Sequence, residues 1–193
     1  MAAPDKDWEN CYRTNDTHWD KGEPSPGLVD WLEKNPDVTK GTVVVPGCGF
    51  GHDVRAFTDA GFTATGYDIA QGAVDGARAR TPARVTAEFN QGDFLADEPA
   101  ESFDWVFEHT FYCAIHPSRR DDHREAVKRW LKPGGHLLAV HYFIENDEPP
   151  PYGTDRDEVI ARFGDDFELL DDWVPRSYPN RTNLERMFWW RKR

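Results

Sequence analysis

VVVPGCGFGHD, residues 43–53, decides the fold, because a run of β-branched residues leads directly into three glycines and then into a segment with helical periodicity. Val54 and Phe57 share one face of the helix expected after the turn. Glycine permits a tight turn and lets a ligand approach the backbone. The stretch predicts a strand, a turn and a helix, and the turn has three possible roles: it holds a nucleotide-like cofactor, a metal or nothing.

Short β-branched or aromatic runs alternate along the chain with longer polar stretches whose apolar residues lie three or four positions apart. This alternation is typical of a parallel sheet covered on both faces. We therefore expect one α/β domain over residues 1–193, with a doubly wound, mostly parallel seven-stranded sheet of the Rossmann-like type and its ligand beyond the carboxyl ends of the strands. The predicted strands are 42–46, 62–68, 84–90, 103–108, 136–144, 167–173 and 186–192.

The clearest predicted helix spans residues 117–131, where Pro117 suits a first helical turn and the apolar residues share one face. The Lys-Pro-Gly-Gly run that follows predicts the end of this helix. Two segments fall outside the alternation: residues 1–40, rich in Trp, Pro and charge, and the proline-rich loop 145–156. We expect both to form walls of a pocket, since loops carry ligand contacts more often than core.

With 193 residues and a net charge of -12, the chain is large enough for one packed domain and poorly suited to a phosphate backbone. Its three cysteines lie far apart without a C-x-x-C pair, which favours reduced thiols over a zinc cluster or a disulfide framework. The chain start does not resemble a secretory signal, and no stretch approaches the roughly 18 apolar residues of a membrane span. We expect a cytoplasmic protein with a small-molecule partner and neither nucleic acid nor membrane as partner, and we favour a monomer.

Two acidic residues follow the glycine turn at informative distances. Asp68 ends the second predicted strand, about 20 residues after the turn, where a carboxylate can accept both hydrogen bonds of a ribose diol. Asp93 follows the third predicted strand and is placed to accept from an adenine amino group, with Phe94 packing against the ring. Together with the glycine turn, these residues predict a nucleoside site.

The turn itself favours one class of nucleoside cofactor. A dinucleotide-binding turn has a third glycine where this chain has His52, and neither a GxxxxGK[ST] phosphate loop nor a Tyr-x-x-x-Lys pair occurs. A G-x-G-x-G turn with an acidic ribose ligand suits S-adenosylmethionine, which carries no phosphate. Cys48 is expected to pack as a small residue. His52, His116 and His123 lack the spacing of metal ligands, so we expect no metal site.

At this point the chain resembles the class I S-adenosylmethionine-dependent methyltransferases, more narrowly the thiopurine methyltransferase superfamily, and within it the halide and thiol methyltransferase branch. The resemblance spans nearly the whole chain. It rests on WENCY (8–12), HWDKGEPSPGL (18–28), VPGCGFGHDV (45–54), GYDIA (66–70), GDF (92–94), FDWVFEHTFYCAIHPSRR (103–120), LKPGGHLL (131–138) and EPPPYG (148–153).

The resemblance implies which residues contact the cofactor, and it places Arg120 facing the acceptor pocket. Tyr12 replaces what is often a Trp in this branch. His109 stands where an aromatic residue is common, a departure that bears on acceptor preference. The implied cofactor contacts are Trp8, Tyr12 and Trp19 near the start, Gly47, Cys48 and Gly49 in the loop, Asp68 and Ile69 at the ribose, Asp93 and Phe94 at adenine, and Glu108 or His109 near the methionine end.

Methyl transfer from a sulfonium is an in-line displacement for which the protein mainly supplies proximity and alignment, worth roughly 7–11 kcal/mol. A thiol with a pKa near 8.5 is only a few per cent ionised at pH 7, so a positive group beside the sulfur would help. We expect Arg120, or Arg119 in its place, to be that group.

Aromatic residues are expected in two places. Some line an apolar pocket around the sulfonium, where cation–π attraction favours the positive charge. Others belong to the core. The pocket group is Trp8, Trp19, Phe111 and Tyr112, and the core group is Trp31, Trp105 and Trp130.

Three hypotheses about function follow. The preferred one is a small-molecule S-methyltransferase that acts on thiols, with halides, thiocyanate or chalcogen anions as further acceptors. The second is a methyltransferase of small O- or N-nucleophiles. The third is a non-catalytic module that binds S-adenosylmethionine without turnover.

Overall fold

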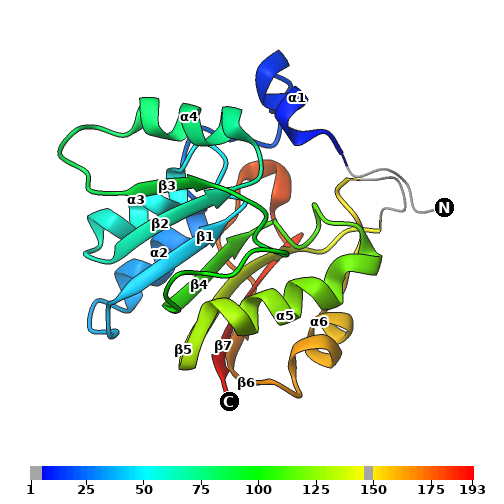
Figure 1. Cartoon of the computed structure of the whole chain (residues 1–193). Helices are drawn as coiled ribbons and strands as arrows, with labels where there is room; N and C mark the ends of the chain where they lie inside the picture. Colours follow the sequence, from blue (N-terminus) through cyan, green and yellow to red (C-terminus); the bar gives the residue numbers. More distant parts are fainter. Residues whose placement is uncertain (1–5, 146–149) are drawn as a thin grey trace.

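The computed structural model describes residues 6–145 and 150–193. Part of the predicted 145–156 wall and of the EPPPYG motif therefore lies outside the described residues. The elements, in chain order (Figure 1), are α1 Trp8–Thr14, α2 Pro26–Lys34, β1 Thr42–Pro46, α3 His52–Asp59, β2 Thr63–Asp68, α4 Gln71–Arg80, β3 Glu88–Gln91, β4 Phe103–His109, the 3-10 turn η1 Pro117–Arg119, α5 Arg120–Trp130, β5 Leu131–Tyr142, α6 Arg156–Phe163, β6 Phe167–Trp173, η2 Pro179–Arg181 and β7 Glu185–Lys192.

The seven strands form one sheet in the order β3-β2-β1-β4-β5-β7-β6. β1 pairs in parallel with β2 on one side and with β4 on the other, so the chain reverses its direction of travel across the sheet between these two neighbours. β7 runs antiparallel between β5 and β6. The predicted doubly wound, mostly parallel seven-stranded sheet is confirmed.

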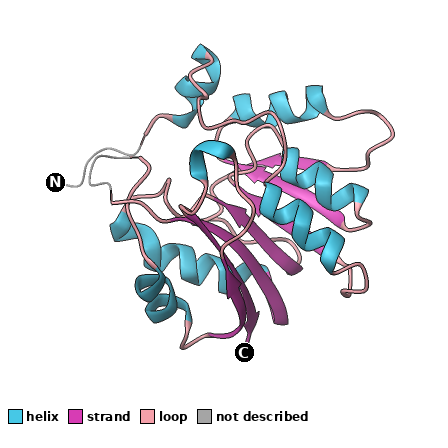
Figure 2. Ribbon diagram, turned by 180° about the vertical axis from the view of Figure 1, so that it is seen from behind, coloured by secondary structure: helices cyan, strands magenta, loops and turns pink. Residues whose placement is uncertain are grey.

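Helices cover both faces of this sheet (Figure 2). Along β1, Val43 and Val45 join a core cluster that includes residues of α2, α3 and α4, whereas Val44 joins the cluster that includes α5 and α6. Alternate side chains of a strand point to opposite faces, so a strand of consecutive valines is buried on both. Burial of β1 on both faces thereby fixes the turn that follows it at the carboxyl end of the strands.

Two strands begin four or five residues away from the predicted start, and the helix predicted over 117–131 is the 3-10 turn η1 followed by α5. The third strand was expected over 84–90 but begins at Glu88, because Val85 N–H donates to the carbonyl of Pro82 at 2.8 Å and closes a turn there. The fifth strand begins at Leu131, earlier than expected. Its Lys-Pro-Gly-Gly run forms an irregularity within the strand, where the pairing with β4 shifts between Phe103 and Trp105.

The predicted aromatic core is confirmed, since Trp31, Trp105 and Trp130 are each at most 3% exposed. Within the described ranges, the helices are too short or too polar for any of them to traverse a bilayer.

Candidate active site

A cavity of about 390 Å³ lies beyond the carboxyl ends of β1, β2, β3 and β4. Gly47 directly follows β1, Asp68 ends β2, and His109 ends β4, and all three line the cavity. The cavity therefore sits where the strand order reverses, which is the position expected for a ligand in a doubly wound sheet.

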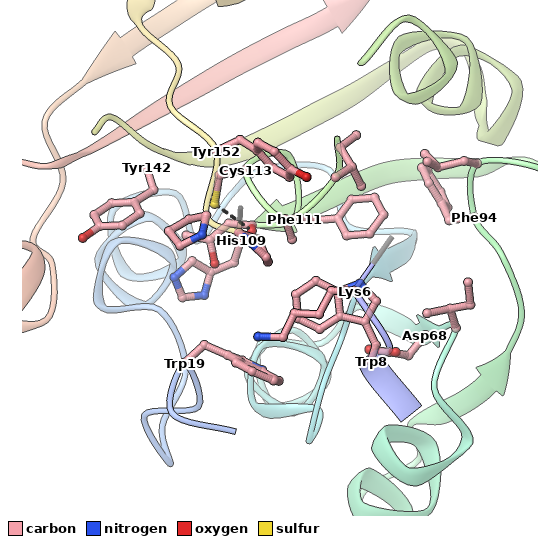
Figure 3. A pocket seen from close by; sticks show the side chains of 18 of the residues that line it. Lys6, Trp8, Trp19, Asp68, Phe94, His109, Phe111, Cys113, Tyr142 and Tyr152 are labelled. Atoms are coloured by element: carbon pink, nitrogen blue, oxygen red, sulfur yellow. Dashed lines mark hydrogen bonds between the residues drawn. The ribbon is translucent and has the colours of Figure 1, made fainter. Parts of the chain in front are cut away.

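The cavity has two sides (Figure 3). The side toward β3 carries Asp68 and Phe94, and the side toward β5 carries His109, Cys113, Tyr142 and Tyr152. We call these the β3 side and the β5 side. By their place in the chain we assign Gly47, Tyr67, Asp68, Ile69, Gly92, Asp93, Phe94 and Leu95 of the lining to the β3 side, and His109, Thr110, Cys113, Tyr142, Tyr152, Asn180 and Arg181 to the β5 side.

The glycine turn and Asp68 form one hydrogen-bonded unit. Asp68 Oδ2 accepts from the N–H of Gly49 at 2.9 Å, and Oδ1 accepts from the N–H of Ala70 at 3.0 Å. Gly47 has φ 59° and Gly49 φ 52°, in the left-handed region that favours glycine. Burial raises the pKa of Asp68 to about 6, although the two backbone donors oppose the rise.

Asp93 and Phe94, which the sequence predicts to contact adenine, both lie in the cavity lining. Asp93 Oδ1 accepts from the N–H of Leu95 at 2.9 Å, while Oδ2 lies 3.8 Å from Nη2 of Arg119. Phe94 is only 3% exposed and packs on Trp130 with ring centroids 4.9 Å apart. Most of the Phe94 ring is therefore buried in the core, and only a small part of it is exposed to the cavity.

The N-terminal segment closes the cavity with aromatic side chains. Trp19 packs edge to face on Trp8 and Tyr12, with centroids 5.3 and 5.9 Å apart. Lys6 Nζ lies 4.7 Å from the Trp19 ring centroid and 5.1 Å from that of Trp8. Glu9 fastens α1 to the rest of the domain, since its Oε2 accepts from the N–H of Gly72 at 2.9 Å.

His109, on the β5 side of the cavity, is flanked by two carboxylates that lie outside the cavity lining. Its Nδ1 is 3.1 Å from Asp53 Oδ2, and its Nε2 is 3.8 Å from Glu185 Oε1. Burial disfavours the charged ring, but the two carboxylates outweigh it and raise the pKa of His109 to about 9. Arg181 Nη1 lies 3.1 Å from the same Glu185 oxygen. Both cations line the cavity, whereas both carboxylates lie outside its lining.

Arg120, expected to face the acceptor pocket, lies outside the cavity lining, and its neighbour Arg119 lines the cavity instead. Arg120 is 5% exposed, donates from Nη2 to the carbonyl of Gly153 at 2.8 Å, and lies 3.3 Å from Glu158 Oε2. Its guanidinium stacks over the ring of Tyr112. Arg120 therefore supports the wall that carries Gly153.

Several other predicted contacts also lie behind the lining. Glu108 is fully buried and accepts from the N–H groups of Phe111 and Tyr112 at 2.9 and 3.0 Å. Tyr112, expected in the aromatic pocket, donates its hydroxyl to Glu158 at 2.7 Å, whereas Phe111 lines the cavity. Cys48 and Gly49 are absent from the lining, and the remaining predicted contacts are present: Trp8, Tyr12, Trp19, Gly47, Asp68, Ile69, Asp93, Phe94 and His109.

Sequence reasoning did not single out several lining residues. Tyr142 is the last residue of β5. Because ligands bind beyond the carboxyl ends of parallel strands, this position could have been predicted to line the cavity. Asn180 and Arg181 belong to η2, which no motif marked. Among residues 6–145 and 150–193, no three His, Cys, Asp or Glu side chains group in a way that would hold a metal ion.

A family sequence model described as Thiopurine S-methyltransferase (TPMT) matches residues 3–174. The chain belongs to this family. It is 31% identical to the Arabidopsis thaliana protein named "Probable thiol methyltransferase 2", over 96% of this chain and 84% of that protein. It is also 31% identical to "Thiocyanate methyltransferase 1" of the same plant, with the same two coverages. This thiopurine S-methyltransferase family member is an S-adenosylmethionine-dependent methyltransferase.

Solved structures share the fold of this family member at low sequence identity. The glycopeptide N-methyltransferase MtfA, complexed with S-adenosyl-L-homocysteine, superposes with a TM-score of 0.74 at 15% identity, over 87% of this chain and 90% of that one. Magnesium protoporphyrin IX methyltransferase from Synechocystis PCC 6803, with bound S-adenosylmethionine, gives 0.70 at 14% identity, over 100% and 87%. The sheet and its helices are therefore those of a methyltransferase.

The cavity's β3 side fits S-adenosylmethionine. Asp68 would hold the ribose and Asp93 the adenine amino group. A side chain at Gly47 would fill the cavity, because a Cβ there would come within 2.6 Å of the Phe111 ring. When bound, S-adenosylmethionine supplies a methyl group already activated on a sulfonium. The chain's own residues would then exclude water, with Trp8 and Trp19 as part of the closing wall, and would align the two reactants.

Proposed function

We propose that this methyltransferase acts on small thiols, with thiocyanate, halide and chalcogen anions as further acceptors. The observation that carries this proposal is the 31% identity, over 96% of the chain, to two plant proteins named for thiol and for thiocyanate methyl transfer. These acceptors are soft nucleophiles that need little more than orientation and a favourable charge.

The β5 side of the cavity supports the same proposal. It combines apolar surfaces with the cations His109 and Arg181, and an aromatic residue, Tyr142, lies under the guanidinium of Arg181 with its ring centroid 5.1 Å away. Cys113 contributes a thiol whose pKa burial raises to about 12, so it is not itself an ionised nucleophile. A small anion finds positive charge here without a competing thiolate.

The test is a headspace assay for methylated volatile products. The purified chain is incubated with S-adenosylmethionine and, separately, sulfide, methanethiol, thiocyanate and iodide. We expect methylated sulfur products, which Asp68→Asn forms at least tenfold more slowly when S-adenosylmethionine is far below saturation. Turnover of small alcohols or amines in the absence of any thiol product would overturn the proposal. Tight cofactor binding without any product from the sulfur and iodide acceptors or from the alcohols and amines would indicate a non-catalytic module that binds S-adenosylmethionine.

We also propose that residues 1–193 act as one domain, in the cytoplasm and as a monomer, on small molecules alone. The net charge of -12 and the scattered basic residues argue against nucleic acid as a partner. The three cysteines are free, as expected in a reducing compartment. Light scattering of the purified chain at several concentrations checks the monomer, and a stable dimer contradicts it.

A further inference from the structure

His109 is held as a cation by an arrangement that crosses the domain. Asp53 reaches it from α3, Glu185 from β7, and the ring of Tyr178 stacks on it with centroids 6.0 Å apart. Asp53 is itself fixed, since its Oδ1 accepts from the N–H of Ser25 at 2.7 Å. The imidazole side chain is 13% exposed and reaches the cavity (Figure 3).

Around His109 the positively charged groups line the cavity, and the negatively charged groups lie outside its lining. Its carboxylate partners lie behind the cavity surface, as does Glu108, the residue before it in β4. From η2, Arg181 faces the same space as His109. The remaining charged or titratable groups of the described cavity lining are Lys6, Tyr12, His18 and Lys21 from the N-terminal segment, Tyr67, Asp68 and Asp93 from the β3 side, Cys113 and Arg119 from the segment after β4, and Tyr142 and Tyr152.

No carboxylate is found on the β5 side among the residues that the structure describes, because the two acidic residues of the lining, Asp68 and Asp93, both belong to the β3 side. The β3 side therefore holds both carboxylates of the described lining, with Arg119 3.8 Å from Asp93, whereas His109 and Arg181 bring positive charge to the β5 side. An opposite charge within about 4–6 Å stabilises an ionised group by the equivalent of one to three pKa units. An acceptor that binds beside His109 as an anion gains this stabilisation, and a neutral acceptor does not.

We propose that His109 is a specificity-determining residue that, as a fixed imidazolium, selects acceptors in their anionic form and keeps a bound thiol as its thiolate. This inference rests on the proposed function, since it concerns the acceptor of that reaction. The thiol gives its proton to solvent on binding. Its sulfur then bonds to the methyl carbon, and the bond from that carbon to the donor sulfur breaks and leaves its electron pair on the donor. His109 gains and loses no proton.

A thiol substrate alone cannot test this role. A cationic His109 with a thiolate and a neutral His109 with a thiol carry the same number of protons, so both give the same dependence of kcat/KM on pH. Thiocyanate carries no proton that a base could remove. Its binding depends on pH only through the groups of the protein and the cofactor product, which makes it the discriminating probe.

The experiment is calorimetric binding of thiocyanate to the protein saturated with S-adenosylhomocysteine, from about pH 7 to pH 10. We expect a constant affinity up to about pH 8 and a fall of about tenfold by pH 10, because His109 has a pKa of about 9. In His109→Gln the thiocyanate affinity at pH 7 is expected to be at least tenfold lower than in the wild type, and the tenfold fall toward pH 10 is expected to be absent. Titrations that match between the two proteins would overturn the proposal.

Two further variants keep the test independent of folding. Asp53→Asn retains His109 but removes one carboxylate, so we expect the fall in thiocyanate affinity to begin at least one pH unit lower. An unmoved fall contradicts the proposal. His136→Gln makes the same chemical change at a histidine outside the cavity lining and is expected to match the wild type. Because binding is measured without turnover, an inactive protein whose thiocyanate affinity follows His109 refutes the proposed function and not this inference.

Discussion

The backbone N–H of Gly49 donates to Asp68 Oδ2 over 2.9 Å, so the turn after β1 and the acid at the end of β2 are a single structural unit. Gly49 itself does not line the cavity, whereas Asp68 does. The glycine therefore serves the cofactor indirectly, by orienting the carboxylate that meets it.

Asp68→Asn is expected to weaken binding of S-adenosylhomocysteine at least tenfold. The amide keeps the size of the side chain but replaces one acceptor oxygen with a donor, which faces the N–H of Gly49 or of Ala70. Calorimetry measures the change. Asp75→Asn, on an exposed carboxylate of α4, is the matched control and should bind as the wild type does.

Cofactor binding is expected to weaken as the pH falls through about 6. The pKa of Asp68 is raised to about 6 by burial, so the carboxylate is ionised above this value and becomes a neutral acid with fewer acceptor sites below it. Titration of S-adenosylhomocysteine from about pH 5 to pH 8 should show this step in the wild type. If Asp68→Asn retains the same step, another group is responsible.

Gly47→Ala and Gly134→Ala separate backbone strain from loss of space. Both glycines have positive φ, 59° and 74°, but a Cβ at Gly134 meets nothing within 4 Å, whereas one at Gly47 meets Phe111. We expect Gly134→Ala to lower the free energy of unfolding by about 1 kcal/mol without affecting the cofactor. Gly47→Ala should cost about 3 kcal/mol and weaken cofactor binding. Equal effects of the two changes on binding would contradict the assignment.

The features predicted correctly from the sequence are those that depend on local patterns. Val43 to Gly51 carries its strand and turn signals within nine consecutive residues, and Asp68 follows from where the next strand ends. The choice between Arg119 and Arg120 depends instead on how η1 passes into α5. Successive residues there point in directions about 100° apart. Only one of the two arginines can face the cavity, and the sequence contains no signal for which one.

The β5 side of the cavity could not be predicted from the sequence for a different reason. It joins His109 to Glu185 and Arg181 across more than 70 residues, through a sheet whose β7 lies next to β5 rather than after β6. A resemblance supplied His109 as a cofactor contact, but nothing in the local sequence places two carboxylates beside it. Such a cluster is a product of strand order, which local patterns do not determine.

Arg120→Ala and Arg119→Ala are expected to affect different properties. Removal of Arg120 takes the donor from the carbonyl of Gly153 and one of several partners from Glu158, which keeps Tyr112 and Arg162, so we expect a loss of about 1–3 kcal/mol in the free energy of unfolding. Arg119→Ala should change stability by less than about 0.5 kcal/mol and act on ligand affinity. Chemical denaturation and thiol kinetics measure both. An Arg120→Ala protein of unchanged stability whose rate falls with every thiol would restore Arg120 to the acceptor pocket.

Trp19 is expected to report cofactor binding by its fluorescence. It lines the cavity and packs edge to face on Trp8, with the ammonium of Lys6 4.7 Å from its ring centroid, so a ligand that enters here changes the polarity around the indole. Addition of S-adenosylmethionine should shift the emission of the wild type and leave that of the double variant Trp8→Phe/Trp19→Phe, which lacks both indoles of the lining, largely unchanged. Trp173→Phe, which removes an indole outside this cavity, is the control and should retain the full response. A double variant Trp8→Phe/Trp19→Phe that still shows the full response would place the cofactor away from the N-terminal segment, and α1 would then have no part in closing the site.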